Sequence, residues 1–121
     1  MYIKTLFYLI TQESPEIICS KIKHSPREVS SIEGYHNIYI HGQKANIIVW
    51  EMNSQNLEGQ FLEVIGIAEK LHSIPGDRHV SCHIIRETHK VNEFYAFLSS
   101  EVLKKYSSLN LELNFEYIEN M

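Results

Sequence analysis

Aspartate is almost absent from this chain, because Asp77 is the only one among fifteen acidic residues. Calcium-binding loops and aspartyl nucleophiles both need a short carboxylate held close to the backbone. The scarcity of aspartate therefore argues against either kind of site. Cysteine is scarce as well: Cys19 and Cys82 have neither a metal-ligand spacing nor the density of a disulfide framework. Both lie in apolar patterns, which favours burial as small hydrophobic side chains.

Long apolar runs and an excess of basic residues are also missing. No stretch approaches the roughly 20 apolar residues of a membrane-spanning helix, and the run Leu6–Ile10 is short for a signal peptide. We therefore expect a cytoplasmic protein without a membrane partner. The formal net charge of −4 at pH 7 argues against a nucleic-acid partner, since phosphate backbones select basic surfaces. A basic protein partner is compatible with this charge.

The composition that is present is typical of a globular protein, with 44% hydrophobic and 21% charged residues among 121. This length suits one hydrophobic core, so we expect a single globular domain over residues 1–121. Hydrophobic periodicity predicts strands at 2–11, 37–42, 45–52, 78–87, 92–98 and 109–120, and helices at 14–23, 57–74 and 100–109. This order predicts an α+β fold: a single mainly antiparallel β-sheet with about three helices packed largely on one face.

Turn and cap residues predict where several of these elements begin and end. The Ser, Pro and Gly residues in 24–37 predict an irregular loop, and Gly42 favours a turn at 41–44. We expect Asn53 or Ser54 to cap the long helix.

Two further positions complete the helix predictions. Ser99 or Ser100 is expected to cap the last helix. Gly66, inside the long helix, costs about 1 kcal/mol relative to alanine. We expect a close approach of the helix to the sheet at Gly66 to offset this cost.

The last predicted strand alternates strictly between apolar and polar residues, which is the pattern of a half-buried strand. We expect its apolar side chains to face the core: Leu109, Leu111, Leu113, Phe115 and Tyr117. Its polar side chains face either water or a basic partner: Asn110, Glu112, Asn114 and Glu116.

The chain has seven histidines, and histidine is a common metal ligand. His79 and His83 have a spacing that binds zinc on a helix, but on a strand they lie about 13 Å apart. The other histidines have no ligand spacing, so we predict neither a metal site nor a cofactor: His24, His36, His41, His72 and His89.

A catalytic site has little support in the sequence. Cys19 or Cys82 could pair with a histidine as a nucleophile, but neither has a glycine-rich elbow beside it. Glycine-rich phosphate-binding motifs are also missing. We therefore expect no catalytic residues and no enzymatic activity, with an enzyme that uses the histidines as the least favoured alternative.

The segment YHNIYIHG interleaves aromatic and histidine side chains. This pattern is typical of an amphipathic edge strand, or of a protein-binding patch, because tyrosine supplies contact area at low entropic cost. Acidic side chains on the last strand would steer a basic partner toward the protein. The candidate partner-binding residues are therefore Tyr35, His36, Tyr39, Glu112, Asn114, Glu116 and Glu119.

Five segments, taken in order, resemble a known family: SPEIICSKI, SPREVSSIEG, IIVWEMNS, LEGQFLEVIGIAEKL and LSSEVLKKYSSLNLELNFEYI. Pro26, Gly34 and Trp50 stand at matching places. The pattern is similar to that of a small bacterial domain family of unknown function, often encoded beside polymorphic toxins. Some of its members are immunity proteins in contact-dependent growth inhibition. The family has no agreed functional residues to carry over.

The resemblance implies an immunity protein that binds and neutralises a cognate toxin and performs no chemistry. Its partner would be the toxin's C-terminal domain, which we expect to be basic. A nuclease fits the acidic balance, since nucleases hold basic clefts for phosphate. The alternative is a small-ligand-binding or regulatory α+β module without catalysis. An exposed edge strand also makes a homodimer feasible.

Overall fold

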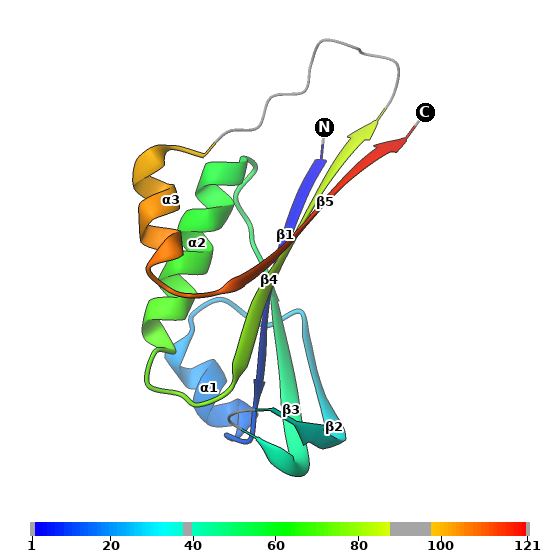
Figure 1. Cartoon of the computed structure of the whole chain (residues 1–121), viewed down its shortest axis with the longest axis vertical. Coiled ribbons are helices and arrows are strands. Elements are labelled where there is room, and N and C mark those ends of the chain that lie inside the picture. Colours follow the sequence, from blue (N-terminus) through cyan, green and yellow to red (C-terminus); the bar gives the residue numbers. More distant parts are fainter. Residues whose placement is uncertain (1, 38–39, 88–97, 121) are drawn as a thin grey trace.

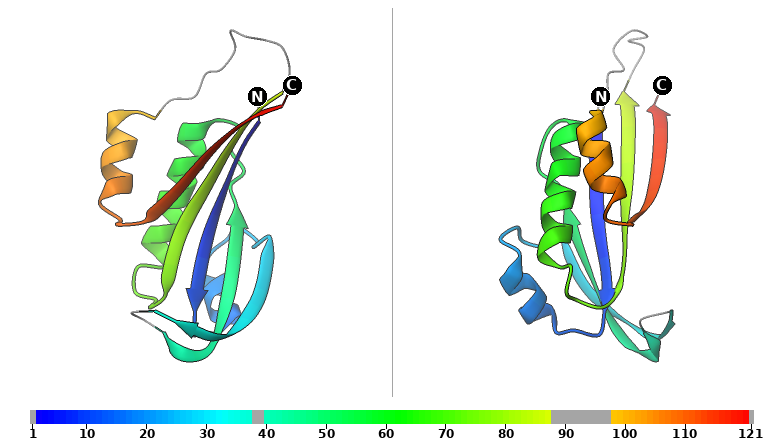
Figure 2. Two further views of the ribbon diagram at one scale, coloured as in Figure 1. Left: turned by 45° about the vertical axis from the view of Figure 1, so that its right-hand side comes forward. Right: turned by 60° about the vertical axis from the view of Figure 1, so that its left-hand side comes forward.

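A five-stranded sheet organises the chain in the computed structural model (Figure 1), which describes residues 2–37, 40–87 and 98–120. The strands are β1 (Tyr2–Thr11), β2 (Glu28–His36), β3 (His41–Glu51), β4 (Asp77–Glu87) and β5 (Glu112–Asn120). The helices are α1 (Pro15–Lys21), α2 (Leu57–Lys70) and α3 (Ser100–Ser107). The strand order is β2-β3-β1-β4-β5, antiparallel except for the parallel pair β4 and β5. Figure 2 shows the helices on one face of this sheet, so the predicted α+β architecture is confirmed.

The core lies between the sheet and the helices. Phe7 on β1 stands opposite Trp50 on β3, and their rings meet edge to face with centroids 6.0 Å apart. Val80 on β4 and Phe61 on α2 are fully buried in the same cluster. Burying each of these large side chains contributes roughly 1.5–3 kcal/mol. β1 is central because both of its alternating sets are apolar, as its sequence predicts.

One buried polar side chain ties α2 to the central strand. Gln60, only 2% exposed, accepts a hydrogen bond from the Thr5 hydroxyl at 2.5 Å. Its amide nitrogen donates to the carbonyl of Ile3 at 2.9 Å and to that of Ser54 at 2.8 Å. Because a buried polar group is costly without a partner, the two bonds to Thr5 and Ile3 fix the position of α2 on β1, and the third holds the segment before the helix.

The loop predicted over 24–37 is wrong, because Glu28–His36 forms the edge strand β2. An edge strand exposed along most of its length has no apolar alternation to reveal it. The pairing of β2 with β3 shifts between Ile32 and Tyr35, where Gly34 has a φ of 71°. A positive φ suits glycine, so the bulge is encoded at this position.

The turn predicted at 41–44 is wrong as well. Those residues open β3, and the connection from β2 falls between His36 and His41. Gly42 has the expected positive φ, at 69°, but it adopts that conformation inside the strand. The strand predicted at 92–98 falls almost entirely on residues 88–97, which lie outside the described residues.

The start of α2 differs in detail from its predicted cap. Asn56 caps the helix by accepting a hydrogen bond from the Gly59 amide at 2.7 Å. The predicted caps have a different role, because the Glu63 carboxylate accepts from the amides of Asn53 and Ser54 at 2.6 and 2.9 Å. The Glu63 carboxylate therefore fixes the segment that precedes α2. Asn56, the side chain nearest the first turn, caps the helix.

Two other helix predictions have opposite outcomes. Ser99 caps α3, as expected, by accepting a hydrogen bond from the Val102 amide at 3.2 Å. The close approach expected at Gly66 is wrong, since a methyl group added there would meet no atom within 4 Å.

The last strand begins at Glu112, three residues later than predicted, and its apolar face is only partly in the core. Leu109 and Leu111, which precede β5, pack against the core cluster. Leu113, Phe115 and Tyr117 are 38%, 53% and 44% exposed, so their predicted burial is wrong. They do share the helix-side face, opposite Val80, Cys82 and Ile84, but β5 runs along the edge of the sheet beyond the helices (Figure 2).

Candidate functional site

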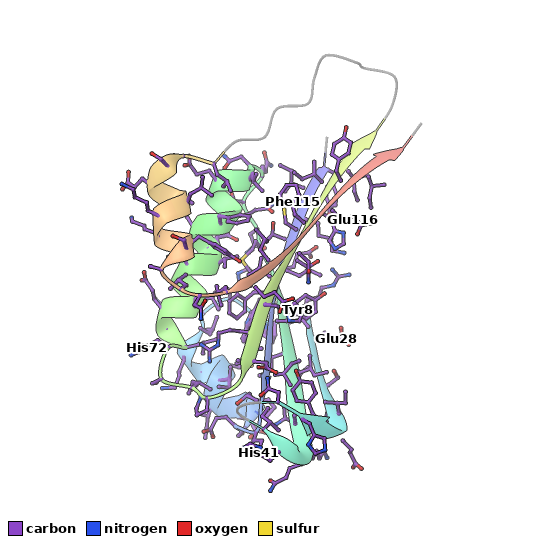
Figure 3. The ribbon with its side chains drawn as sticks, viewed as in Figure 1. Tyr8, Glu28, His41, His72, Phe115 and Glu116 are labelled. Carbon is purple, nitrogen blue, oxygen red and sulfur yellow. The ribbon has the colours of Figure 1, made fainter. Side chains whose placement is uncertain are left out.

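The face of the sheet opposite the helices carries polar and aromatic side chains from every strand; we call it the open face. Strand register places five residues side by side in one row across it: Glu28, Val49, Tyr8, His79 and Glu112. Figure 3 shows Tyr8, Glu28 and Glu116 on the side of the sheet away from the helices. Because successive side chains of a strand point to opposite faces of the sheet, the residues of this row lie on the face away from the core.

The centre of the open face is a stacked aromatic pair. The rings of Tyr8 and His79, on neighbouring strands, lie 4.4 Å apart with an interplanar angle of 11°. Leu6 and Val49 flank the pair and are buried although they belong to the open face. Burial lowers the pKa of His79, opposed by the charges of Glu112 and Asp77. The ring is therefore neutral at pH 7, and the charge of this region comes from carboxylates.

Asp77 is held in place at one end of the pair. The Tyr35 hydroxyl donates a hydrogen bond of 2.5 Å to its carboxylate. This hydrogen bond, then burial and the negative charge of Asp77, raise the pKa of Tyr35 to about 12. The bulge at Gly34 shifts the register just before Tyr35, which brings a side chain of the edge strand to a residue of β4. Tyr35 thus orients one of the acidic groups of the open face.

A second polar group lies along β4 and β5. His83 Nδ1 is 3.2 Å from Glu116 Oε2, and its Nε2 is 2.9 Å from the Ser81 hydroxyl. Ser81 stands opposite Asn114, and His83 stands opposite Glu116. The polar residues of β5 are therefore arranged on the open face by their partners on β4.

The basic side chains of the open face are mostly engaged with one carboxylate. Lys4 Nζ and Arg27 Nη1 lie 4.0 and 3.5 Å from Glu51 Oε1. Among the described residues, no lysine or arginine forms an ion pair with Glu28 or Glu112. The open face therefore presents an excess of negative charge around Tyr8 and His79.

The structure brings several of the predicted binding residues together. Tyr35, Glu112, Asn114 and Glu116 share the open face. His36 is exposed at the end of β2. Of the other two, Tyr39 lies outside the described residues, and Glu119 belongs to β5, although its side chain is not among those described.

The sequence reasoning missed the middle of the face. The sequence does not single out Tyr8, Glu28 or Asp77 as binding residues, and it suggests His79 only as a metal ligand or a catalytic base. Each strand shows which of its own residues share a face, and in β1 Tyr8 shares a face with Leu6 and Ile10, although both faces of this strand are apolar. The signal for Tyr8 was therefore present in the strand pattern, but its stacking on His79 depends on the pairing of β1 with β4, which are far apart in sequence.

Cys82, a candidate nucleophile, is fully buried. Burial raises the pKa of its thiol, and a 3.5 Å hydrogen bond from the Thr5 hydroxyl opposes this shift. A protonated, enclosed thiol is a packing group, unlike the exposed thiolate of a reactive cysteine. Within residues 2–37, 40–87 and 98–120, no three His, Cys, Asp or Glu side chains converge as a metal-binding group.

A pocket of about 690 Å³ lies on the helix side, between the end of α2 and the connection from α3 to β5. Arg78 lines it and donates hydrogen bonds to the carbonyls of Leu71, at 3.1 Å, and Ile74. The arginine thus caps the end of α2. His72 and Asn110 are polar residues of the same lining.

No family model, curated protein or solved structure matches this chain. None of the helices in the described ranges is both long enough and apolar enough to cross a membrane.

Proposed function

We propose that this protein is an immunity protein that binds and neutralises a basic bacterial toxin domain through its open face. The observation that carries the proposal is the acidic surround of the Tyr8–His79 pair, formed by Glu28, Asp77 and Glu112. Carboxylates arranged around a packed aromatic centre suit a positively charged partner. The sequence resemblance to toxin-associated domains and the net charge of −4 support the same proposal.

The two parts of the open face have different roles in this proposal. Solvent-exposed charge pairs contribute about 0.2–1 kcal/mol each, so the carboxylates mainly speed association and select a basic partner. Tyr8 and His79 are half-buried and held by their neighbours, so they lose little entropy on binding. An aromatic residue at the centre of an interface is the usual position of a hot spot. We therefore place most of the binding energy on Tyr8.

Neutralisation would need no chemistry from this chain. A toxin that cleaves nucleic acid exposes a basic cleft, and an acidic face covering that cleft excludes the substrate. A nuclease is therefore the class of toxin that fits best. The immunity protein would act in the cytoplasm of the producing cell, where such a toxin meets its substrate.

The direct test is co-expression with the C-terminal domain encoded by the adjacent upstream gene. We expect the two proteins to purify as a complex and the cells to survive expression of the toxin domain. Tyr8→Ala should weaken the complex about 30-fold or more, as expected for a hot spot. Leu62→Ala is the control, because Leu62 is exposed on α2, on the helix side. A toxic domain that neither binds the protein nor is neutralised by it would overturn the proposal.

A second candidate function is favoured by the pocket of about 690 Å³ beside Arg78. Its volume is in the range of small-molecule sites. A regulatory or ligand-binding module would show a clear rise in melting temperature with one compound of a metabolite panel. Such a rise, together with no effect of the upstream toxin domain, would favour this function over immunity.

A further inference from the structure

The edge of the sheet formed by β5 combines an open backbone with exposed apolar side chains. Among the described residues, β5 pairs with β4 and with no other strand. Phe115 is 53% exposed and Leu113 is 38% exposed on the helix side of this strand. Folded proteins usually protect a long apolar edge strand, because its free backbone groups pair readily with another strand.

We infer that β5 pairs with β5 of a second copy of this chain, antiparallel and centred on Phe115. A two-fold axis at Phe115 places the two Phe115 side chains opposite each other. It also places Leu113 opposite Tyr117 of the second copy, on the same face. Cross-strand aromatic and aliphatic pairs of this kind stabilise antiparallel sheets. The two sheets then form one continuous sheet with both sets of helices on the same side.

The charges on β5 select this register from its neighbours. Centred on Phe115, Glu116 stands opposite Asn114 and Glu112 stands opposite Ile118 of the second copy. Centring on Asn114 would place Glu112 opposite Glu116, and centring on Glu116 would place two Glu116 carboxylates face to face. Like charges directly opposite each other are destabilising in a sheet. The Phe115 register avoids every such pair between Glu112 and Glu116.

The pairing is weak and depends on salt. Two nine-residue edge strands form a small interface, so we expect a dissociation constant on the order of 10 µM. The four carboxylates of Glu112 and Glu116 in the two copies still lie near one another. Raising NaCl from about 50 to 500 mM screens their repulsion and strengthens the dimer. The toxin complex should weaken over the same range, because its charges attract.

Analytical ultracentrifugation of the full chain tests the dimer. The weight-average mass should rise from the monomer value toward twice that value across micromolar concentrations. Phe115→Asp should abolish the rise, whereas the control Leu103→Asp, on α3 at a side chain 48% exposed, should leave it unchanged. Circular dichroism checks that both variants fold. A wild-type chain that stays monomeric would overturn the inference.

Crosslinking with oxidised glutathione tests the register, in a Cys19→Ser background. Directly opposed residues of antiparallel strands have Cα atoms about 4.5–5.5 Å apart, which a disulfide can bridge. Phe115→Cys should therefore form a covalent dimer, and Asn114→Cys should not. Linkage through Asn114→Cys alone would overturn the proposed register. The inference does not rest on toxin binding: a monomer that still protects against the toxin would refute the dimer and leave the proposed function standing.

Discussion

Replacing Gln60 by leucine should be among the most destabilising changes that keep side-chain volume nearly constant. The amide of Gln60 makes three hydrogen bonds that join α2 to β1 and to the segment before the helix. Leucine fills the space but leaves the carbonyl of Ile3 and the hydroxyl of Thr5 without this partner. The substitution therefore separates the contribution of the hydrogen bonds from that of packing.

The size of the effect follows from the burial of each partner. A buried polar group that loses its hydrogen bond costs about 1–3 kcal/mol. The loss is largest at the Ile3 carbonyl, because its hydrogen bond with the Gln60 amide is buried. Ser54 is only partly buried, so its carbonyl regains water, and Thr5 keeps its contact with the Cys82 sulfur. We expect the free energy of unfolding to fall by about 2–4 kcal/mol.

Urea denaturation followed by far-UV circular dichroism measures this loss, and Thr5→Val completes a double-mutant cycle. Thr5→Val keeps the shape of the side chain and should cost about 1–2 kcal/mol. Because both residues share one hydrogen bond, the double variant should be less destabilised than the sum by about 1 kcal/mol. Strictly additive losses, or a Gln60→Leu loss below about 0.5 kcal/mol, would refute the role of this network.

Three other predictions concern stability. Gly66→Ala should raise the free energy of unfolding in urea by about 0.5–1 kcal/mol, because the methyl group meets no atom within 4 Å and helix propensity improves. Gly76→Ala should lower it by more than about 2 kcal/mol, since φ is 156° and the new Cβ would lie 2.5 Å from the Ile10 carbonyl oxygen; an unchanged midpoint in either variant would contradict these assignments. Because burial lowers the pKa of His79 below its ordinary value of 6.5, the unfolded chain binds more protons as pH falls through 6.5. Stability should therefore decline as pH falls from about 7 to 5.5, and His79→Gln should decline less; equal slopes would contradict the burial of the ring.

The elements that the sequence predicts best are those with two-sided or strictly alternating apolar patterns. β1 and β4 are examples: Val80, Cys82 and Ile84 point inward as expected. β2 was missed because an exposed edge strand takes its hydrogen bonds from β3 and needs no apolar face of its own. Local pattern therefore identifies central strands better than edge strands.

The last strand shows what a local pattern leaves open. Alternation correctly places Leu113 and Phe115 on one face and Glu112 and Glu116 on the other. Whether a helix covers that face depends on where α3 packs, which no residue of β5 encodes. The same limit applies to the candidate site, because the Tyr8–His79 pair depends on strand register between distant segments.

Isothermal titration of the upstream-encoded toxin domain against matched charge-reversal variants tests the proposed function most directly. Glu112→Lys with Glu116→Lys changes the open face, and Glu69→Lys with Glu101→Lys makes the same change in net charge at exposed residues of α2 and α3. We predict that the open-face pair weakens binding about 10-fold or more, while the helix-side pair stays within about 3-fold of the wild type. Equal affinities for the two pairs would contradict binding through the open face.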